Sequence, residues 1–172
     1  MNNILIYCET TAQGKIAEVS LELCSKGRQL ANQMGTQLDA VVLGSKIDNL
    51  EAQLYPFGVD TILYADSERL SPYRTLPHFA ILKGIIEERR PEVVLFGATC
   101  IGRDLAPRIS AALRCGLTAD CVQLEVGEHV DAKTKTEYKN ILLQIRQHSA
   151  ATSWPPSSRR RLVHRWPPSA KA

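Results

Sequence analysis

Several patterns that would assign a function at once are missing from this sequence of 172 residues. No stretch approaches the roughly 18 consecutive apolar residues that a membrane-spanning helix requires, and residues 1–3 lead into a strand pattern without a charged leader and an apolar signal segment. The five cysteines are an odd number, form no CxxC pair and have no regular spacing to the four histidines. We therefore expect no membrane insertion, metal site or disulfide framework, and a soluble protein in the reducing cytoplasm.

Acidic residues are absent from residues 147–172, which contain five basic ones. The remainder of the chain has 16 basic and 18 acidic residues, so the net charge of +3 arises from this tail alone. As a basic arm rich in proline, serine and arginine, the tail would have an affinity for nucleic acid. The five basic residues are Arg159, Arg160, Arg161, Arg165 and Lys171.

What the sequence does contain is an alternation of short apolar runs with helical patterns. Such alternation, with short connections, is typical of βαβ units, and right-handed crossovers then give a doubly wound sheet. We predict a three-layer α/β fold with a mainly parallel, Rossmann-like sheet. The expected strands are residues 3–8, 38–43, 59–64, 93–96, 121–126 and 139–145; the expected helices are residues 15–34, 47–55, 76–89 and one that continues through Leu113; a polar, hairpin-like connection spans 127–137.

The segment GATCIGRDLAP, from Gly97 to Pro107, lies where the fourth strand passes into a helix. We expect Gly97 to end the strand, Gly102 to permit a sharp turn and Asp104 to lie near the helix start. Free amides at such a turn can bind an anion, but neither GxGxxG nor a Walker lysine is present. The structural alternative is that Asp104 caps or charges the helix while Arg103 pairs with a carboxylate or a partner subunit.

Other polar groups give weaker signals. The turn GLTAD, with Thr118 and Asp120, is typical of a helix end with a polar cap and has no histidine or second carboxylate nearby. The cluster at residues 9–11 follows the first strand, at the edge where doubly wound folds bind ligands, although loop solvation explains it as well. Neither His78 nor His129 has a visible triad partner.

The segments GATCIGRDLAPRISAAL and GLTADC, preceded by NILIYCE, resemble the N-terminal domain of the electron transfer flavoprotein alpha subunit, from about residue 3 to Arg146. The resemblance implies an adenine nucleotide alpha hydrolase-like fold and part of an alpha–beta heterodimer carrying FAD. That heterodimer would pass electrons from flavin dehydrogenases, such as acyl-CoA dehydrogenases of fatty acid oxidation, to a quinone reductase or another acceptor. The signature positions, as interface candidates, are Gly97, Gly102, Arg103, Asp104, Thr118 and Asp120.

The resemblance also implies a division of labour within the subunit. The family's N-terminal domain is mainly scaffold and packs on the beta subunit, while the flavin sits chiefly in a C-terminal domain whose serine- and glycine-rich motifs have no counterpart here. We therefore carry over no catalytic or FAD-binding residue and expect the fragment to bind no FAD tightly.

The character of the sequence changes after Arg146, and a shifted reading frame accounts for the change. Read one base back, the codons of residues 147–153 can encode the family's Pro-Ala-Phe-Gly-Gly-Asn-Ile, and both Trp-Pro-Pro-Ser segments can encode Met-Ala-Thr followed by Ile or Val. We therefore expect a domain at residues 1–146 that lacks its last strands and has an unpaired edge near 139–145. Residues 147–172 would be an out-of-frame, disordered tail, which removes most of the support for nucleic-acid binding.

One other class of function stays open from the sequence. A stand-alone adenine-nucleotide-binding module of the universal stress protein type would use the loop after the first strand and the Gly97 turn to hold AMP or ATP.

Overall fold

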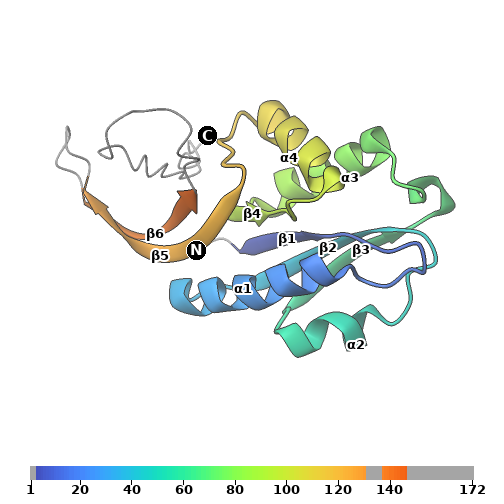
Figure 1. Ribbon diagram of the computed structural model, residues 1–172, viewed down its shortest axis with the longest axis horizontal. Helices are drawn as coiled ribbons and strands as arrows, with labels where there is room; N and C mark the ends of the chain where they lie inside the picture. Colours follow the sequence, from blue (N-terminus) through green and yellow to red (C-terminus); the bar gives the residue numbers. More distant parts are fainter. Residues whose placement is uncertain (1–2, 131–136, 147–172) are drawn as a thin grey trace. The chain divides into compact units, whose positions relative to one another are not determined.

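The computed structural model describes residues 3–130 and 137–146, and the chain divides into two compact units, Met1–Cys115 and Gly116–Ala172 (Figure 1). The first unit contains a four-stranded sheet of order β3-β2-β1-β4. All three pairings in this sheet are parallel, with Ile4 opposite both Leu38 and Val93. Its strands are β1 (Ile4–Cys8), β2 (Leu38–Gly44), β3 (Thr61–Asp66) and β4 (Val93–Leu95).

Helices cover both faces of this sheet, which gives the three layers predicted from the sequence. Helices α1 (Glu18–Met34) and α2 (Leu50–Leu54) lie on one side, and α3 (Thr75–Arg89) and α4 (Cys100–Leu113) lie on the other (Figure 1). Two 3₁₀ turns, Tyr55–Phe57 and Glu68–Leu70, flank β3. The doubly wound, Rossmann-like α/β prediction is confirmed.

The core forms because the central strands are apolar on both faces, as a buried parallel sheet requires. Every residue of β1 and β2 is buried. Gly27 lets α1 approach the sheet closely, since a Cβ there would lie 2.7 Å from Cδ1 of Ile6 and 2.8 Å from Cδ1 of Leu38. On the opposite face the core cluster consists of Leu5, Tyr7, Val41, Leu43, Leu70, Leu82, Ile86, Leu105 and Ile109.

The helix starts differ from the sequence expectation. Helix α2 begins at Leu50 rather than at residue 47, and α3 begins one residue early, at Thr75. Helix α1 begins at Glu18 rather than Lys15, because the preceding residues form a loop in which Ala17 N–H donates to the Glu9 carbonyl at 2.8 Å. Helix α4 begins at Cys100, so Gly102 lies inside it and makes no turn. The predicted end of α1 is correct, since Gly35 adopts the left-handed conformation with φ of 64°.

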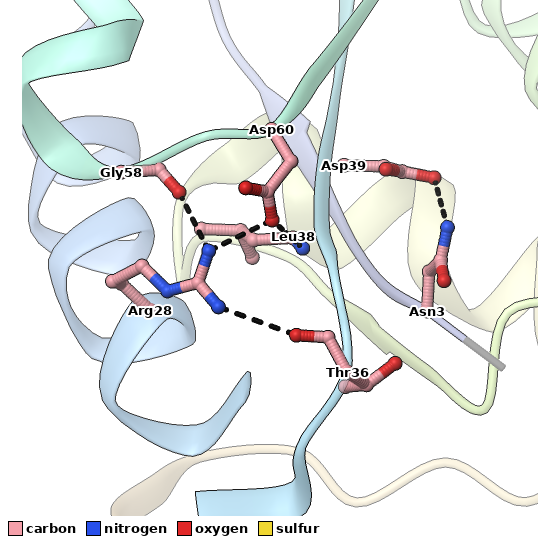
Figure 2. A network of polar contacts seen from close by, with 7 residues as sticks. All are labelled: Asn3, Arg28, Thr36, Leu38, Asp39, Gly58 and Asp60. Carbon is pink, nitrogen blue, oxygen red and sulfur yellow. Dashed lines mark hydrogen bonds and ion pairs between the residues drawn. The ribbon is translucent and has the colours of Figure 1, made fainter. Parts of the chain in front are cut away.

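At the amino-terminal edge of the sheet, Arg28 of α1 joins three segments (Figure 2). Its Nη1 donates to the Gly58 carbonyl at 3.0 Å and to Asp60 Oδ2 at 2.7 Å, and its Nη2 donates to the Thr36 carbonyl at 3.2 Å. Asp60 Oδ2 also accepts from the Leu38 amide at 2.8 Å. This network fixes α1 against the amino ends of β2 and β3. It therefore lies at the edge of the sheet opposite the carboxyl ends of the strands, where ligands of such folds bind.

The second unit contains an antiparallel pair, β5 (Cys121–Val130) and β6 (Glu137–Arg146). Both predicted strands are present, and β5 extends four residues beyond its expected end at Val126. Within residues 116–130 and 137–146, β6 pairs with β5 alone. The centre of the predicted connection (131–136) and the tail (147–172) lie outside the described residues, and the predicted domain boundary after Arg146 stays a prediction.

Candidate functional site

The strand order of the four-stranded sheet reverses between β1 and β4, and the carboxyl ends of these two strands flank the position where doubly wound folds bind ligands. Glu9 follows β1 directly, and Gly97 follows β4 by two residues. Thr99 is the N-cap of α4, which starts at the same edge. The chain's candidate site is therefore the group formed by Glu9, Gly97, Thr99 and Gly102, here called the switch-point cluster.

Hydrogen bonds connect the switch-point cluster across 90 residues of sequence. The Thr99 hydroxyl donates to Glu9 Oε1 at 2.5 Å and accepts from the Gly102 amide at 3.0 Å. The Glu9 amide donates to Ser20 Oγ at 2.9 Å, which ties the end of β1 to α1. Glu9 is only 7% exposed, so its carboxylate belongs to the protein interior.

The two glycines of the cluster serve close packing of the backbone. A Cβ on Gly102 would lie 2.0 Å from the Gly97 carbonyl oxygen, a distance that no side chain tolerates. A Cβ on Gly97 would lie 3.4 Å from Glu9 Oε1 and 3.3 Å from Val19 Cγ2. The glycine signature therefore brings the first turn of α4 against the end of β4.

This arrangement places the protein's own carboxylate where a nucleotide's phosphate would be needed. The N-terminus of α4 favours negative charge, and Glu9 is joined through Thr99 to that first turn. This acidic side chain distinguishes the switch-point cluster from a phosphate site that is lined by free helix amides alone.

The loop after β1 also folds over this edge of the sheet. Thr10 and Ile16 form an isolated antiparallel bridge, and the Thr11 amide donates to the Lys15 carbonyl at 2.7 Å. A Cβ on Gly14 would lie 2.2 Å from the carbonyl oxygen of Lys46, so the loop packs directly on the segment after β2. Within this loop Thr10 is half-buried and Thr11 is exposed, and both interpretations of residues 9–11, ligand contact and solvation, stay predictions.

Asp104 has a different place from the one expected, because Thr99 and not Asp104 caps α4. Its Oδ2 accepts hydrogen bonds from Tyr73 Oη at 2.8 Å and Thr75 Oγ1 at 2.6 Å, and its Oδ1 accepts from Arg108 Nε at 3.0 Å. The bonds from Thr75, Tyr73 and Arg108 lower the pKa of Asp104 from 3.8 to about 2. Asp104 therefore joins α4 to the start of α3.

His78, which showed no triad partner in the sequence, is a core residue. Its Nδ1 lies 2.7 Å from Tyr7 Oη and its Nε2 lies 2.9 Å from the Leu70 carbonyl. Since the carbonyl can only accept, Nε2 carries the proton and Nδ1 accepts from the tyrosine. Burial lowers the pKa of His78, and burial is also the largest cause of the raised pKa of Tyr7. Both groups therefore stay neutral, and their hydrogen bonds fix the turn before α3.

The six signature residues thus divide among several places. Gly97 and Gly102 meet at the switch point, Asp104 joins α3 to α4, and Arg103 is exposed on α4. Thr118 and Asp120 lie in the second unit, in the segment before β5, where Asp120 has a φ of 54°. Across residues 3–130 and 137–146, no three potential ligand side chains gather to hold a metal ion, and no helix is long and apolar enough to cross a membrane.

The sequence did not single out Thr99, Ser20, Tyr73 or Thr75. Threonine before a helix is a common N-cap, so the cap at Thr99 could have been found from that preference. Its pairing with Glu9 could not, because it depends on the adjacency of β1 and β4.

Comparison with known proteins identifies relatives that match between 66% and 74% of the chain. A sequence model of the electron transfer flavoprotein domain matches residues 4–152. The electron transfer flavoprotein subunit alpha of Clostridium acetobutylicum is 42% identical over 113 residues, 66% of this chain and 34% of that protein. The corresponding subunit of Thermoanaerobacterium thermosaccharolyticum is 40% identical over 127 residues, 74% of this chain and 38% of its own.

A third relative has a more specific name. The acryloyl-CoA reductase electron transfer subunit beta of Anaerotignum propionicum is 39% identical over 124 residues, 72% of this chain and 34% of that protein. The chain spans about a third of the length of these curated relatives. Because the domain model matches residues 4–152, which is most of the chain, the chain belongs to the electron transfer flavoprotein domain family.

Proposed function

We propose that this chain is the N-terminal scaffold part of an electron transfer flavoprotein alpha subunit and works in electron transfer within an alpha–beta heterodimer. It contributes no catalytic residue of its own. The observation that carries the proposal is the domain match over residues 4–152, together with relatives that are themselves named electron transfer subunits.

The switch-point cluster supports a scaffold role. In a nucleotide-binding module this edge of the sheet would present free helix amides to a phosphate, whereas here Thr99 caps the Gly102 amide and Glu9 accepts from Thr99. The same geometry argues against the universal stress protein alternative, which needs this edge for AMP or ATP. FAD, in this proposal, is bound by the full-length subunit, and the switch-point cluster takes no part in holding it.

The partners follow from the family and from the names of the relatives. The first partner is a beta subunit, and the electron donors are flavin dehydrogenases. One relative is named as a subunit of an acryloyl-CoA reductase, and another, from Acetobacterium woodii, as a subunit of a lactate dehydrogenase that uses NAD(+) and ferredoxin. We propose a donor or acceptor of this kind, acting on a small acyl-CoA or hydroxy acid, in place of a partner restricted to fatty acid oxidation.

Co-purification tests the proposal. The chain is expressed with an affinity-tagged electron transfer flavoprotein beta subunit from the same genome, and the captured material is measured by densitometry and flavin absorbance. We expect the chain to be captured in a defined ratio, without flavin bound to the chain itself. Failure of capture, or tight binding of ATP by the isolated chain in calorimetry, would contradict the proposal.

A pair of charge reversals sharpens this test. Arg103 is exposed on α4 within the signature segment, and Arg89 is exposed at the end of α3 outside it. We expect Arg103→Glu to reduce capture roughly tenfold, as the loss of a charged interface contact does, and Arg89→Glu to leave it within about twofold. Equal effects of the two substitutions would show that the signature segment is not the interface.

A further inference from the structure

Two thiols that the proposed function does not use lie together between β1 and α1. Cys8 is the last residue of β1 and Cys24 lies in the second turn of α1. Both are 0% exposed, and their sulfur atoms are 3.8 Å apart. The remaining cysteines are Cys100, which is exposed, and Cys115 and Cys121, which are half-buried.

The two sulfur atoms are in contact at 3.8 Å, so a short approach separates them from bonding distance. A disulfide requires about 2.05 Å between sulfur atoms, so each must move by about 1 Å, a displacement within reach of small side-chain rotations. The elements that hold them are already in contact, because Gly27, one turn after Cys24, lets α1 lie directly on Ile6. The pair is thus a preformed dithiol rather than two unrelated core residues.

The two thiols also differ in acidity in the way that an attacking and a resolving cysteine do. The two thiols share a hydrogen bond in which either sulfur can donate, and this bond lowers the pKa of Cys24 and raises that of Cys8. Cys24 therefore has the greater thiolate character, and the thiolate is the nucleophilic form that attacks a peroxide oxygen.

We propose that Cys8 and Cys24 form a disulfide when the protein meets a hydroperoxide, and that this bond ties the end of β1 to α1. The Cys24 thiolate attacks the peroxide O–O bond, which gives the sulfenic acid of Cys24 and releases the alcohol or water. The Cys8 sulfur then attacks the Cys24 sulfur, and the sulfenic hydroxyl leaves as water with the proton of Cys8. The two thiols lose two electrons in total, and the hydroperoxide accepts them.

Burial of the pair makes access the slow step. Access to the pair requires a local opening at the N-terminus of α1, in which the hydrogen bonds that join Ala17 and Ser20 to the Glu9 backbone break. Local opening of such a helix end is far less costly than global unfolding. Once formed, the disulfide lies next to Glu9 and would hold the switch-point cluster more rigidly. This inference does not depend on the proposed function.

Mass spectrometry tests the inference on the full chain with Cys100, Cys115 and Cys121 changed to serine. Hydrogen peroxide is applied in buffer and at urea concentrations below the unfolding transition, and remaining thiols are alkylated after denaturation. We expect a mass loss of about 2 Da without alkylation, and a rise of the melting temperature by roughly 5–10 °C, since the bond closes a loop of about 15 residues. Nonreducing peptide mapping should join the two cysteine peptides.

The matched control is Cys24→Ser in the same background, which leaves the single buried thiol of Cys8. It should remain fully alkylatable under the same peroxide treatment. Two alkylated thiols, or sulfinic products without cross-linking, at every urea concentration below unfolding would overturn the inference. If the serine background does not fold, peptide mapping of the unmodified chain gives the same decision, because a Cys8–Cys24 peptide is distinct from every other pairing.

Discussion

Two carboxylates, Glu9 and Asp104, show how single residues connect distant parts of this chain. Each accepts hydrogen bonds from hydroxyl groups on other segments: Glu9 from Thr99, and Asp104 from Tyr73 and Thr75. Charge-assisted bonds of this kind are stronger than those between neutral groups. The chemistry of the signature residue Asp104 is therefore that of a structural acceptor between two helices.

The lowered pKa of Asp104 makes a prediction about acid stability. A group with a folded pKa of about 2 and an ordinary value of 3.8 stabilises the fold fully above pH 4, and this contribution is lost as the pH falls through about 2. We expect the urea midpoint of the wild-type chain to exceed that of Asp104→Asn at pH 5, and the difference to shrink steadily between pH 4 and 2. A difference that stays constant over this range would show that the ionised form of Asp104 contributes nothing.

At the scale of elements, the contact between the end of β4 and the first turn of α4 depends on glycine for space and not for conformational freedom. Neither Gly97 nor Gly102 is among the residues with positive φ. A Cβ on residue 102 would lie 2.0 Å from the Gly97 carbonyl oxygen. This oxygen belongs to the backbone, so it cannot move aside as a flexible side chain can. Helix α4 can therefore start where it does only if this residue has no side chain.

Two glycine-to-alanine substitutions in helices distinguish the steric cost of an added Cβ from the gain in helix propensity. Gly102→Ala should destabilise the first unit by about 2–3 kcal/mol or prevent its folding, because the backbone of β4 and α4 must separate. Gly84→Ala in α3 meets nothing within 4 Å and should stabilise by about 0.5–1 kcal/mol through helix propensity. Urea unfolding followed by circular dichroism gives both values; equal effects would contradict the role assigned to Gly102.

The elements themselves were largely predictable, and the contacts between them were not. Strands β1 and β2 could be located because uninterrupted apolar runs are what a sheet covered on both faces requires. The start of α4 was misplaced because Gly102 was taken for a turn residue, and a sequence does not show that a glycine faces another backbone. The bond between Glu9 and Thr99 depends on the reversal of strand order, which only the assembled sheet reveals.

At the scale of the whole molecule, the chain consists of a parallel α/β unit followed by a second unit that contains the antiparallel pair β5 and β6. A two-stranded ribbon is marginally stable alone, and three or more strands or a covering helix are needed for independent stability. In the proposed parent subunit, the segment after Arg146 would continue the domain. Whether the domain can be completed therefore depends on the sequence that follows Arg146.

We propose that the reading frame shifts near residue 147, and the repeated Trp-Pro-Pro-Ser at residues 154 and 166 carries this proposal. A tryptophan codon ends in G and a proline codon begins with CC, so the shifted frame must encode alanine at both places, and it can encode methionine before and threonine after it. Resequencing the DNA around codon 147 should reveal one missing base. Restoring it should give Pro-Ala-Phe-Gly-Gly-Asn-Ile and then a longer open frame with an FAD-type domain. A stop codon soon after the restored base, or a confirmed DNA sequence with no missing base, would contradict the proposal. Residues 147–172 would then be the encoded basic arm of the protein.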